Sequence, residues 1–240
     1  MPDINIPEIQ QKLYEKLKPS GWGQALKGFF ISSDMEKILL QLQTESEENR
    51  KFTPRLKQVF RFLEECPYDK VKVVMMLQCP YQYMIEDKTV ADGIPMSCLN
   101  TGKPQPSLSF VHKDIRKTVY HDQLWKAPID LKLWANQGVL LINAALTTTI
   151  GKVDTHLVLW RPFLIYLLDV LTWQKPGLVY VYMGNVAQRH MSLTPDNNYK
   201  FTTTHPASAA HNNAEIWESE DIWNKVNQTL EKNNQTKIIW

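Results

Sequence analysis

The sequence predicts an α/β fold, a single domain built on a four-stranded parallel sheet with helices on both faces. Four short stretches are apolar almost throughout, as expected of strands buried on both sides. Helical patterns alternate with them, which is typical of strand–helix–strand units. The chain has 240 residues, of which 43% are hydrophobic, enough for one large core. We expect one domain over 1–240, with helices over 1–66 and the sheet and its loops over 67–240.

The elements follow from these patterns in chain order. Strands are predicted at 71–77 (VKVVMML), 138–143 (GVLLIN), 178–184 (LVYVYMG) and 199–205 (YKFTTTH), of which the last is the least apolar. Helices are predicted at 6–17, 34–43, 53–65, 106–115, 131–136, 161–171 and 221–232. Pro162 is tolerated because it would lie in the first turn of its helix. The apolar ending Ile238, Ile239 and Trp240 is expected to dock onto the domain.

Charge and cysteine content narrow the class of protein. The formal net charge is +2, far from the strongly basic balance that by itself indicates a nucleic-acid binder. The three cysteines, Cys66, Cys79 and Cys98, include no CxxC pair, which disfavours a disulfide framework or a structural zinc site. We expect no metal, no cofactor, and an intracellular, reducing location in the cytoplasm or nucleus. The sequence shows no signal-peptide pattern and no apolar run long enough to span a membrane.

Polar side chains gather where the predicted strands end. Parallel sheets bind ligands at the carboxyl ends of their strands, and all four ends here carry groups that could hydrogen-bond a small planar polar ligand. Strand ends can also be polar simply because the chain leaves the core there. The residues are Gln78, Cys79, Pro80, Tyr81 and Gln82 after the first strand, Asn143 after the second, Gly184, Asn185 and Gln188 after the third, and His205 and Pro206 after the fourth.

Six motifs, in order along the chain, resemble those of family-1 uracil-DNA glycosylases. KVVMMLQCPYQ (72–82) is similar to KVVILGQDPYH, ADGIPMS (91–97) to AHGLxFS, and KPQPSL (103–108) to a proline-rich loop. WANQGVLLINAALT (134–147) is similar to WAxQGVLLLNxxLT and is the most specific match. VYMGNVAQ (181–188) resembles the Gly-Ser loop, and HPASAA (205–210) resembles the HPSPLS loop. The resemblance covers most of the chain, from about position 14 to its end.

The resemblance implies a protein that binds DNA, flips a uracil out of the base stack and hydrolyses its N-glycosidic bond. Flipping is needed because the reacting carbon cannot be reached inside a duplex. Asn143 would read the edge of the uracil, and Tyr81 would exclude the methyl group of thymine. His205 would stabilise the departing uracil anion. The candidate base-binding residues are Gln78, Tyr81, Met96 and Asn143.

Cys79 is the main departure from the family pattern. It stands where the resemblance places a catalytic Asp that orients water, and a thiol near its ordinary pKa of about 8.5 is mostly neutral. Gln82 likewise replaces a His, Met96 replaces a stacking Phe, and the segment 83–90 is longer than in the family. Cys79 and His205 are the candidate catalytic residues. Cys79 could be a buried residue without chemistry, a weak ligand of water, or a thiolate nucleophile with His205 as its base.

DNA contacts are expected on the loops around these residues. Asn185 replaces a Ser of the Gly-Ser loop and can still reach a phosphate, and Ala209 falls where the family carries a Leu that wedges into the base stack. The other histidines (112, 121, 156, 190 and 211) are expected to be structural or on the surface. The candidate DNA-binding residues are Pro104, Pro106, Ser107, Gly184, Asn185, Pro206, Ser208 and Ala209.

Three functions stay open at this stage. The leading hypothesis is a family member that binds single- or double-stranded DNA and a flipped uracil-like base, with hydrolysis lost or much reduced by Cys79. The second is an active base-excision enzyme whose water is held by backbone carbonyls and Gln82. The third is a non-catalytic subunit of a replication or transcription assembly, as would suit a virus acting inside its host cell. The expected partners are DNA and a protein partner in such an assembly, and we expect no membrane partner.

Overall fold

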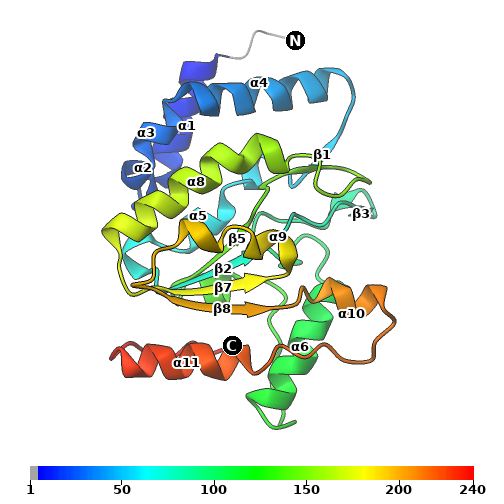
Figure 1. The fold of residues 1–240 in the computed structure, drawn as a ribbon. Coiled ribbons are helices and arrows are strands. Elements are labelled where there is room, and N and C mark those ends of the chain that lie inside the picture. Colours follow the sequence, from blue (N-terminus) through cyan, green and yellow to red (C-terminus); the bar gives the residue numbers. More distant parts are fainter. Residues whose placement is uncertain (1–4) are drawn as a thin grey trace.

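A four-stranded parallel sheet forms the centre of the computed structural model, which describes residues 5–240 apart from the side chain of His211 (Figure 1). The strands lie in the order β5-β2-β7-β8. The strands that follow β2 in the chain lie on both sides of it, β5 on one side and β7 on the other. In such sheets a ligand is expected to bind where the strand order changes direction, here at the carboxyl ends of β2 and its neighbours. All four predicted strands are confirmed, as β2 (Val73–Leu77), β5 (Val139–Asn143), β7 (Val179–Met183) and β8 (Tyr199–Thr203).

Helices cover both faces of this sheet. In Figure 1, α5 (Arg61–Glu65), α8 (Leu157–Gln174) and the N-terminal helices lie above the sheet, and α6 (Pro106–Thr118) and α11 (Ile222–Lys232) lie below it. The N-terminal helices are α1 (Ile6–Leu17), α2 (Trp22–Ala25), α3 (Lys27–Phe30) and α4 (Ser33–Glu47). Short helices occur at α7 (Lys132–Ala135), α9 (Asn185–Gln188) and α10 (Ala207–His211).

Two small antiparallel sheets flank the central one. β1 (Phe52–Thr53) pairs with β6 (Thr148–Thr149), and β3 (Met84–Ile85) pairs with β4 (Lys88–Thr89). The β3–β4 hairpin occupies the segment 83–90. Its two turn residues, Glu86 and Asp87, both have positive φ, as the tight turns of two-residue hairpins require.

The prediction of a continuous helix over 53–65 is wrong. The segment instead contains the end of β1, a 3₁₀ turn over Leu56–Gln58 and the short helix α5. Thr53 is paired with Thr148 in the small sheet, and Pro54 has no N–H to continue a helix. Tertiary pairing and proline therefore override the helical pattern at the start of this segment.

Helix α8 begins four residues earlier than predicted, so Pro162 lies inside it and not in its first turn. The carbonyl of Val158 consequently has no N–H partner from Pro162, and Val158 is 85% exposed, which allows water to solvate that region. Among the helices that the structure describes, only α8 is long and apolar enough to span a membrane. Its buried side chains, including Trp160 and Phe163, pack in the core.

The chain end docks as predicted, with one exception. Ile238 and Trp240 are buried, whereas Ile239 is exposed. The Trp240 backbone oxygen accepts hydrogen bonds from the Tyr120 hydroxyl at 2.9 Å and from Trp125 Nε1 at 3.0 Å. These contacts fix the C-terminus against the end of α6 and the loop that follows it.

Candidate functional site

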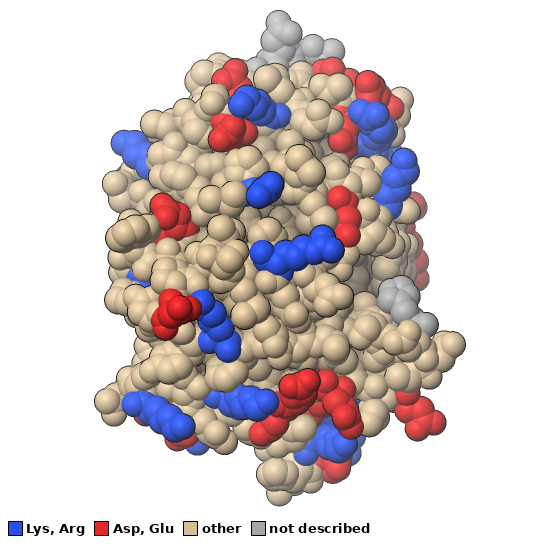
Figure 2. Space-filling view, viewed as in Figure 1, with Lys and Arg blue, Asp and Glu red and all other residues tan. Residues whose placement is uncertain are grey.

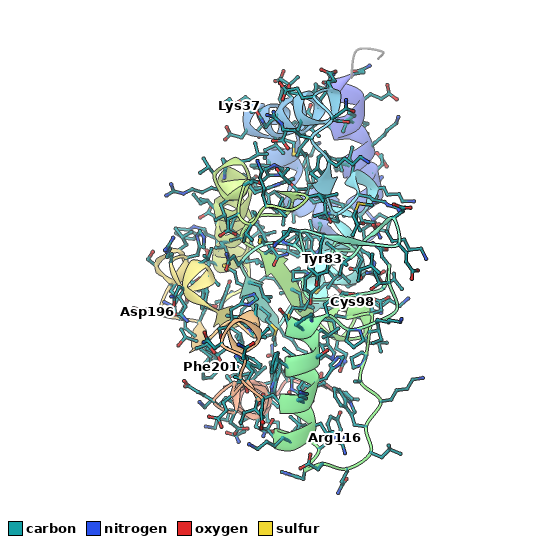
Figure 3. All side chains as sticks on the ribbon, turned by 90° about the vertical axis from the view of Figure 1, so that its right-hand side faces the viewer. Lys37, Tyr83, Cys98, Arg116, Asp196 and Phe201 are labelled. Carbon is teal, nitrogen blue, oxygen red and sulfur yellow. The ribbon has the colours of Figure 1, made fainter. Side chains whose placement is uncertain are left out.

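A cleft of about 470 Å³ lies at the carboxyl edge of the sheet, with its walls drawn from the ends of all four strands and from the start of α6. Figure 3 looks onto this side of the molecule, with Tyr83 near the centre. Ten of the fourteen predicted site residues line the cleft. They are Gln78, Cys79, Tyr81, Met96, Ser107, Asn143, Gly184, Asn185, His205 and Ser208.

The other four predicted residues do not line it. Pro104 and Pro106 are exposed on the loop that leads into α6, whereas Pro206 and Ala209 are buried. Ala209 is 5% exposed and packs in the core. A small buried side chain cannot wedge into a base stack, so this position does not provide the insertion that the resemblance implied.

Asn143 is placed opposite Leu77 by the parallel register of β5 and β2. The Ala144 N–H donates to Leu77 O at 3.0 Å, and the Ala145 N–H donates to Gln78 O at 3.1 Å. These bonds hold the ends of the two strands side by side. The Asn143 amide makes no hydrogen bond with any residue that the structure describes, so its donor and its acceptor are available to a ligand in the cleft.

Met96 is held in a strained conformation at the wall of the cleft. Its φ is +63°, a left-handed region that bulky side chains rarely adopt. The buried Asp92 fixes the surrounding loop: its carboxylate accepts from the Ile94 N–H at 3.0 Å, the Ser97 hydroxyl at 2.6 Å and the Leu99 N–H at 2.8 Å.

Arg61 anchors the same loop from α5. It pairs with Asp92 at 3.0 Å and with Asp130 at 2.7 Å, and it is largely buried. Burial opposes the charged form of Arg61, but the two carboxylates more than offset this and the pKa of Arg61 is raised. Gly93 passes so close to Gln58 O that a Cβ would overlap it. The position of Met96 is therefore determined by several independent contacts.

His205 has a defined tautomer. The Ala207 N–H donates to His205 Nδ1 at 3.1 Å, so a neutral ring carries its proton on Nε2. The Ser208 hydroxyl donates to the His205 backbone oxygen at 2.7 Å. Because His205 lines the cleft, its ring can offer a hydrogen-bond donor there.

Cys79 is neutral in this environment. Burial raises the pKa of its thiol to about 12; the backbone N–H of Asp154 partly opposes this rise, and the Asp154 carboxylate adds to it. A thiolate nucleophile needs the opposite shift. The surroundings of Cys79 thus argue against the nucleophile hypothesis.

Asp154 lies beside Cys79 although the sequence analysis did not select it. Its Oδ2 accepts a hydrogen bond from Gln78 Nε2 at 2.6 Å. No periodic pattern marks this position, because Asp154 belongs to an irregular loop between β6 and α8. The other cleft-lining residues that were not selected as site residues are Leu77, Pro80, Gln82, Tyr83, Val153, Val186, Gln188, Thr204 and Ala207.

The charged residues do not form a single basic face on the side of the molecule that Figure 2 shows. Lys and Arg are intermingled with Asp and Glu on the side seen in Figure 2, and the described residues that line the cleft include neither Lys nor Arg.

Within residues 5–240 no group of three His, Cys, Asp or Glu side chains could hold a metal ion. His156 is buried and bonded to Glu45 at 3.0 Å, a structural role; the His211 side chain lies outside the described part.

Fold and cleft together define an α/β protein that presents amide, imidazole and aromatic side chains in a cleft at the carboxyl edge of its sheet. No model of a known protein family matches the sequence. The chain is 30% identical over 221 residues to the uracil-DNA glycosylase of Campylobacter fetus, covering 91% of both proteins. It is 29% identical over 244 residues to that of Acinetobacter baumannii, covering 99% of this chain and 98% of the relative. The chain belongs to the uracil-DNA glycosylase family.

The structure agrees with this assignment. The mimivirus uracil-DNA glycosylase crystal structure superposes with a TM-score of 0.81 and 22% sequence identity, over 95% of this chain and 88% of the viral one. At that identity the likeness concerns the fold. It matches the α/β fold with a four-stranded parallel sheet that the sequence predicted.

Proposed function

We propose that this protein binds DNA and holds a flipped uracil-type base in the cleft, and that it hydrolyses the N-glycosidic bond slowly. The observation that carries the proposal is the arrangement at the sheet edge. The register of β5 and β2 sets the unpaired amide of Asn143 beside the Gln78–Cys79 corner, and His205 lines the same cleft. Membership of the uracil-DNA glycosylase family supports uracil in DNA as the ligand.

The cleft chemistry suits a uracil ring. The amide of Asn143 can donate to one exocyclic oxygen while it accepts from the ring N–H. Met96 can cover a face of the base with a polarisable thioether. The His205 Nε2–H can donate to an oxygen on which negative charge develops when the base leaves, which is the kind of stabilisation that lowers a barrier most.

Cys79 is the reason to expect slow hydrolysis. With a pKa of about 12 the thiol is uncharged at neutral pH. It provides no negative charge to stabilise a cationic sugar and is too weak a base to activate water. The pocket therefore favours binding over chemistry.

Binding and excision are tested separately. Fluorescence anisotropy at low salt compares single-stranded oligonucleotides that differ only in one central uracil or thymine, because the phosphate contribution is strongest at low salt. Excision is measured with excess protein on the uracil oligonucleotide and read as alkali-induced cleavage on a denaturing gel. We expect preferential uracil binding and slow cleavage.

The substitution Asn143→Ala supplies the specificity control. Thymine has the same hydrogen-bonding edge but is expected to be kept out of the cleft by Tyr81, so loss of these hydrogen bonds should lower the affinity for uracil DNA alone, by about 1–3 kcal/mol. Asn212→Ala, on the exposed turn after α10, should leave the uracil preference intact. Equal affinities for uracil and thymine DNA in the wild type would contradict base recognition. Absence of DNA binding at low salt would favour the alternative of a non-catalytic subunit that acts through protein contacts.

A further inference from the structure

We propose that Asp154 partly replaces the missing carboxylate of the water site, acting as a positioning residue through Gln78 and Cys79. The proposal rests on the proposed function, since it assumes a uracil nucleotide in the cleft. Asp154 would supply the negative charge near the sugar and would orient the amide of Gln78 toward the attacking water. Asp154 lies on a loop that is distant in sequence from the Gln78–Cys79 corner.

The loop that carries Asp154 is fastened to this corner at two points. Gln78 Nε2 donates to Asp154 Oδ2 at 2.6 Å, and the Gly151 N–H donates to Gln82 O at 2.7 Å. Asp154 itself has a φ of +63°, which Asp and Asn tolerate better than most residues. Its neighbour Val153 lines the cleft. The carboxylate is thus held directly behind the cleft wall.

The Asp154 bond settles the orientation of the Gln78 amide. Amide nitrogen and oxygen are normally assigned from their partners, and a carboxylate accepts hydrogen bonds but does not donate them. Nε2 must therefore face Asp154. Gln78 lines the cleft, and its Oε1 forms no hydrogen bond within the described residues, so this oxygen can accept a hydrogen bond from a water molecule placed against the sugar.

A second acceptor remains on Asp154. Its Oδ1 is buried and has no well-formed hydrogen-bond partner among residues 5–240. A buried carboxylate oxygen without a partner is costly, and such an atom in a folded protein calls for an explanation, of which a role in catalysis is one. The backbone N–H and the carboxylate of Asp154 both lie close enough to the Cys79 thiol to influence its pKa, so the negative charge lies near the position where the resemblance places an Asp.

The chemical step balances without any further reactant. The bond between C1′ and N1 of deoxyuridine breaks and its electron pair leaves with uracil, where the His205 Nε2–H stabilises the anion. The sugar cation, stabilised by the charge of Asp154, takes up water held by Gln78 Oε1. The proton released from that water neutralises the uracil anion, which gives free uracil and an abasic site.

The first test removes the charge with little change of shape. Asp154→Asn should lower the single-turnover excision rate of saturating protein about tenfold or more, because the charge acts in a poorly solvated site. Asp154→Glu should restore part of the rate. Affinity for uracil DNA should stay equal or rise, since a negative charge near the phosphates is lost. A merely structural role would instead lower rate and affinity together.

The matched control is Asp87→Asn. Asp87 lies at the turn of the β3–β4 hairpin with a φ of +59°, so the substitution makes the same change of charge at a similar backbone conformation, on an exposed residue. We expect it to leave the excision rate unchanged. A tenfold loss there as well would assign the effect to overall charge and overturn the role of Asp154.

The second test changes Cys79 as well. In Cys79→Asp two carboxylates would lie side by side, and like charges at that distance hinder each other's ionisation. Adding Asp154→Asn to Cys79→Asp should therefore raise the excision rate, whereas Asp154→Asn alone lowers it. The same sign in both backgrounds, or no excision by the wild type, would overturn the proposal. Failure of the proposed function is recognised separately, as loss of uracil preference in binding.

Discussion

Gly184 lies so close to His205 that a Cβ on the glycine would stand 2.8 Å from the His205 Cβ. Gly184 also has a φ of +86° and follows β7, while His205 follows β8, so the contact joins two neighbouring strand ends. The Gly184 N–H donates to Thr203 O at 2.8 Å. This close approach sets where the imidazole can lie in the cleft.

Gly184→Ala should therefore displace His205 as well as strain the backbone. The positive φ costs about 1–3 kcal/mol for a non-glycine residue. Gly177→Ala is the matched control, since Gly177 has a φ of +80° and a Cβ there would meet nothing within 4 Å. We expect both variants to lose stability in urea denaturation, Gly184→Ala more because its Cβ also overlaps His205, and we expect loss of excision only in Gly184→Ala. Equal excision by both variants would contradict a role for this contact.

The thiol of Cys79 should resist alkylation at neutral and mildly alkaline pH. Burial raises its pKa to about 12, and likewise raises that of Cys66 to about 12 and that of Cys98 to about 11. Because the thiolate is the reactive form, iodoacetamide labelling of the native protein, followed by mass spectrometry, should stay slow at pH 8. The denatured protein, in which all three thiols titrate normally, is the control.

The same shifts fix how stability depends on pH. Below about pH 8.5 a thiol is neutral in both the folded and the unfolded chain, so the thiols make no difference there. Above that, the unfolded chain loses protons first and stability should fall as pH rises toward 12. Cys79→Ala should reduce the alkaline loss measured by urea denaturation between pH 8 and 10. In the labelling experiment, rapid reaction of Cys79 with iodoacetamide at pH 8 would contradict its raised pKa and would support the thiolate hypothesis.

Arg61→Gln should loosen the loop that carries Met96. Removal of one partner of a buried ion pair costs about 3–5 kcal/mol, because the remaining charge stays buried, and Arg61 serves both Asp92 and Asp130. Urea denaturation should show this loss. Arg116→Gln is the control, since its pair with Asp122 is exposed at 3.9 Å and should be worth less than about 1 kcal/mol. Equal losses would show that the buried network is not what holds the loop.

The strands were predictable because burial on both faces leaves a local signal. β2 and β5 are buried at every position, and their continuous apolar runs show this directly. Strand order and register carry no such signal, since they depend on contacts between distant segments. For that reason the sequence could place Asn143 and Cys79 at strand ends but could not show which residues face each other there.

The contact of Asp154 with Cys79 could not be predicted for the same reason. It depends on pairing of β1 with β6, which folds the loop after β6 back toward the end of β2. The DNA contact expected at Ala209 is a different case: a motif match fixed the place of this residue in the chain, but its burial is a property of the packed helix α10.

Tyr81 offers the sharpest test of base selection. Its hydroxyl donates to Met96 O at 3.4 Å, and its ring lies 6.0 Å from that of Tyr83, edge to face. If this packed ring occupies the space of a methyl group on the base, Tyr81→Ala should admit thymine. We expect the ratio of uracil to thymine affinity in the anisotropy assay to fall about tenfold, because one methyl or methylene group in a pocket changes the free energy that discriminates two ligands by about 1–3 kcal/mol.

Tyr83→Ala distinguishes selection by Tyr81 from a general widening of the cleft. Tyr83 also lines the cleft, but its hydroxyl donates to Gln105 Oε1 at 2.9 Å, which holds the ring toward the loop before α6. This variant should weaken uracil and thymine DNA equally, without changing their ratio. A larger change of the ratio in Tyr83→Ala than in Tyr81→Ala would transfer the methyl-excluding role to Tyr83, the residue directly before the β3–β4 hairpin.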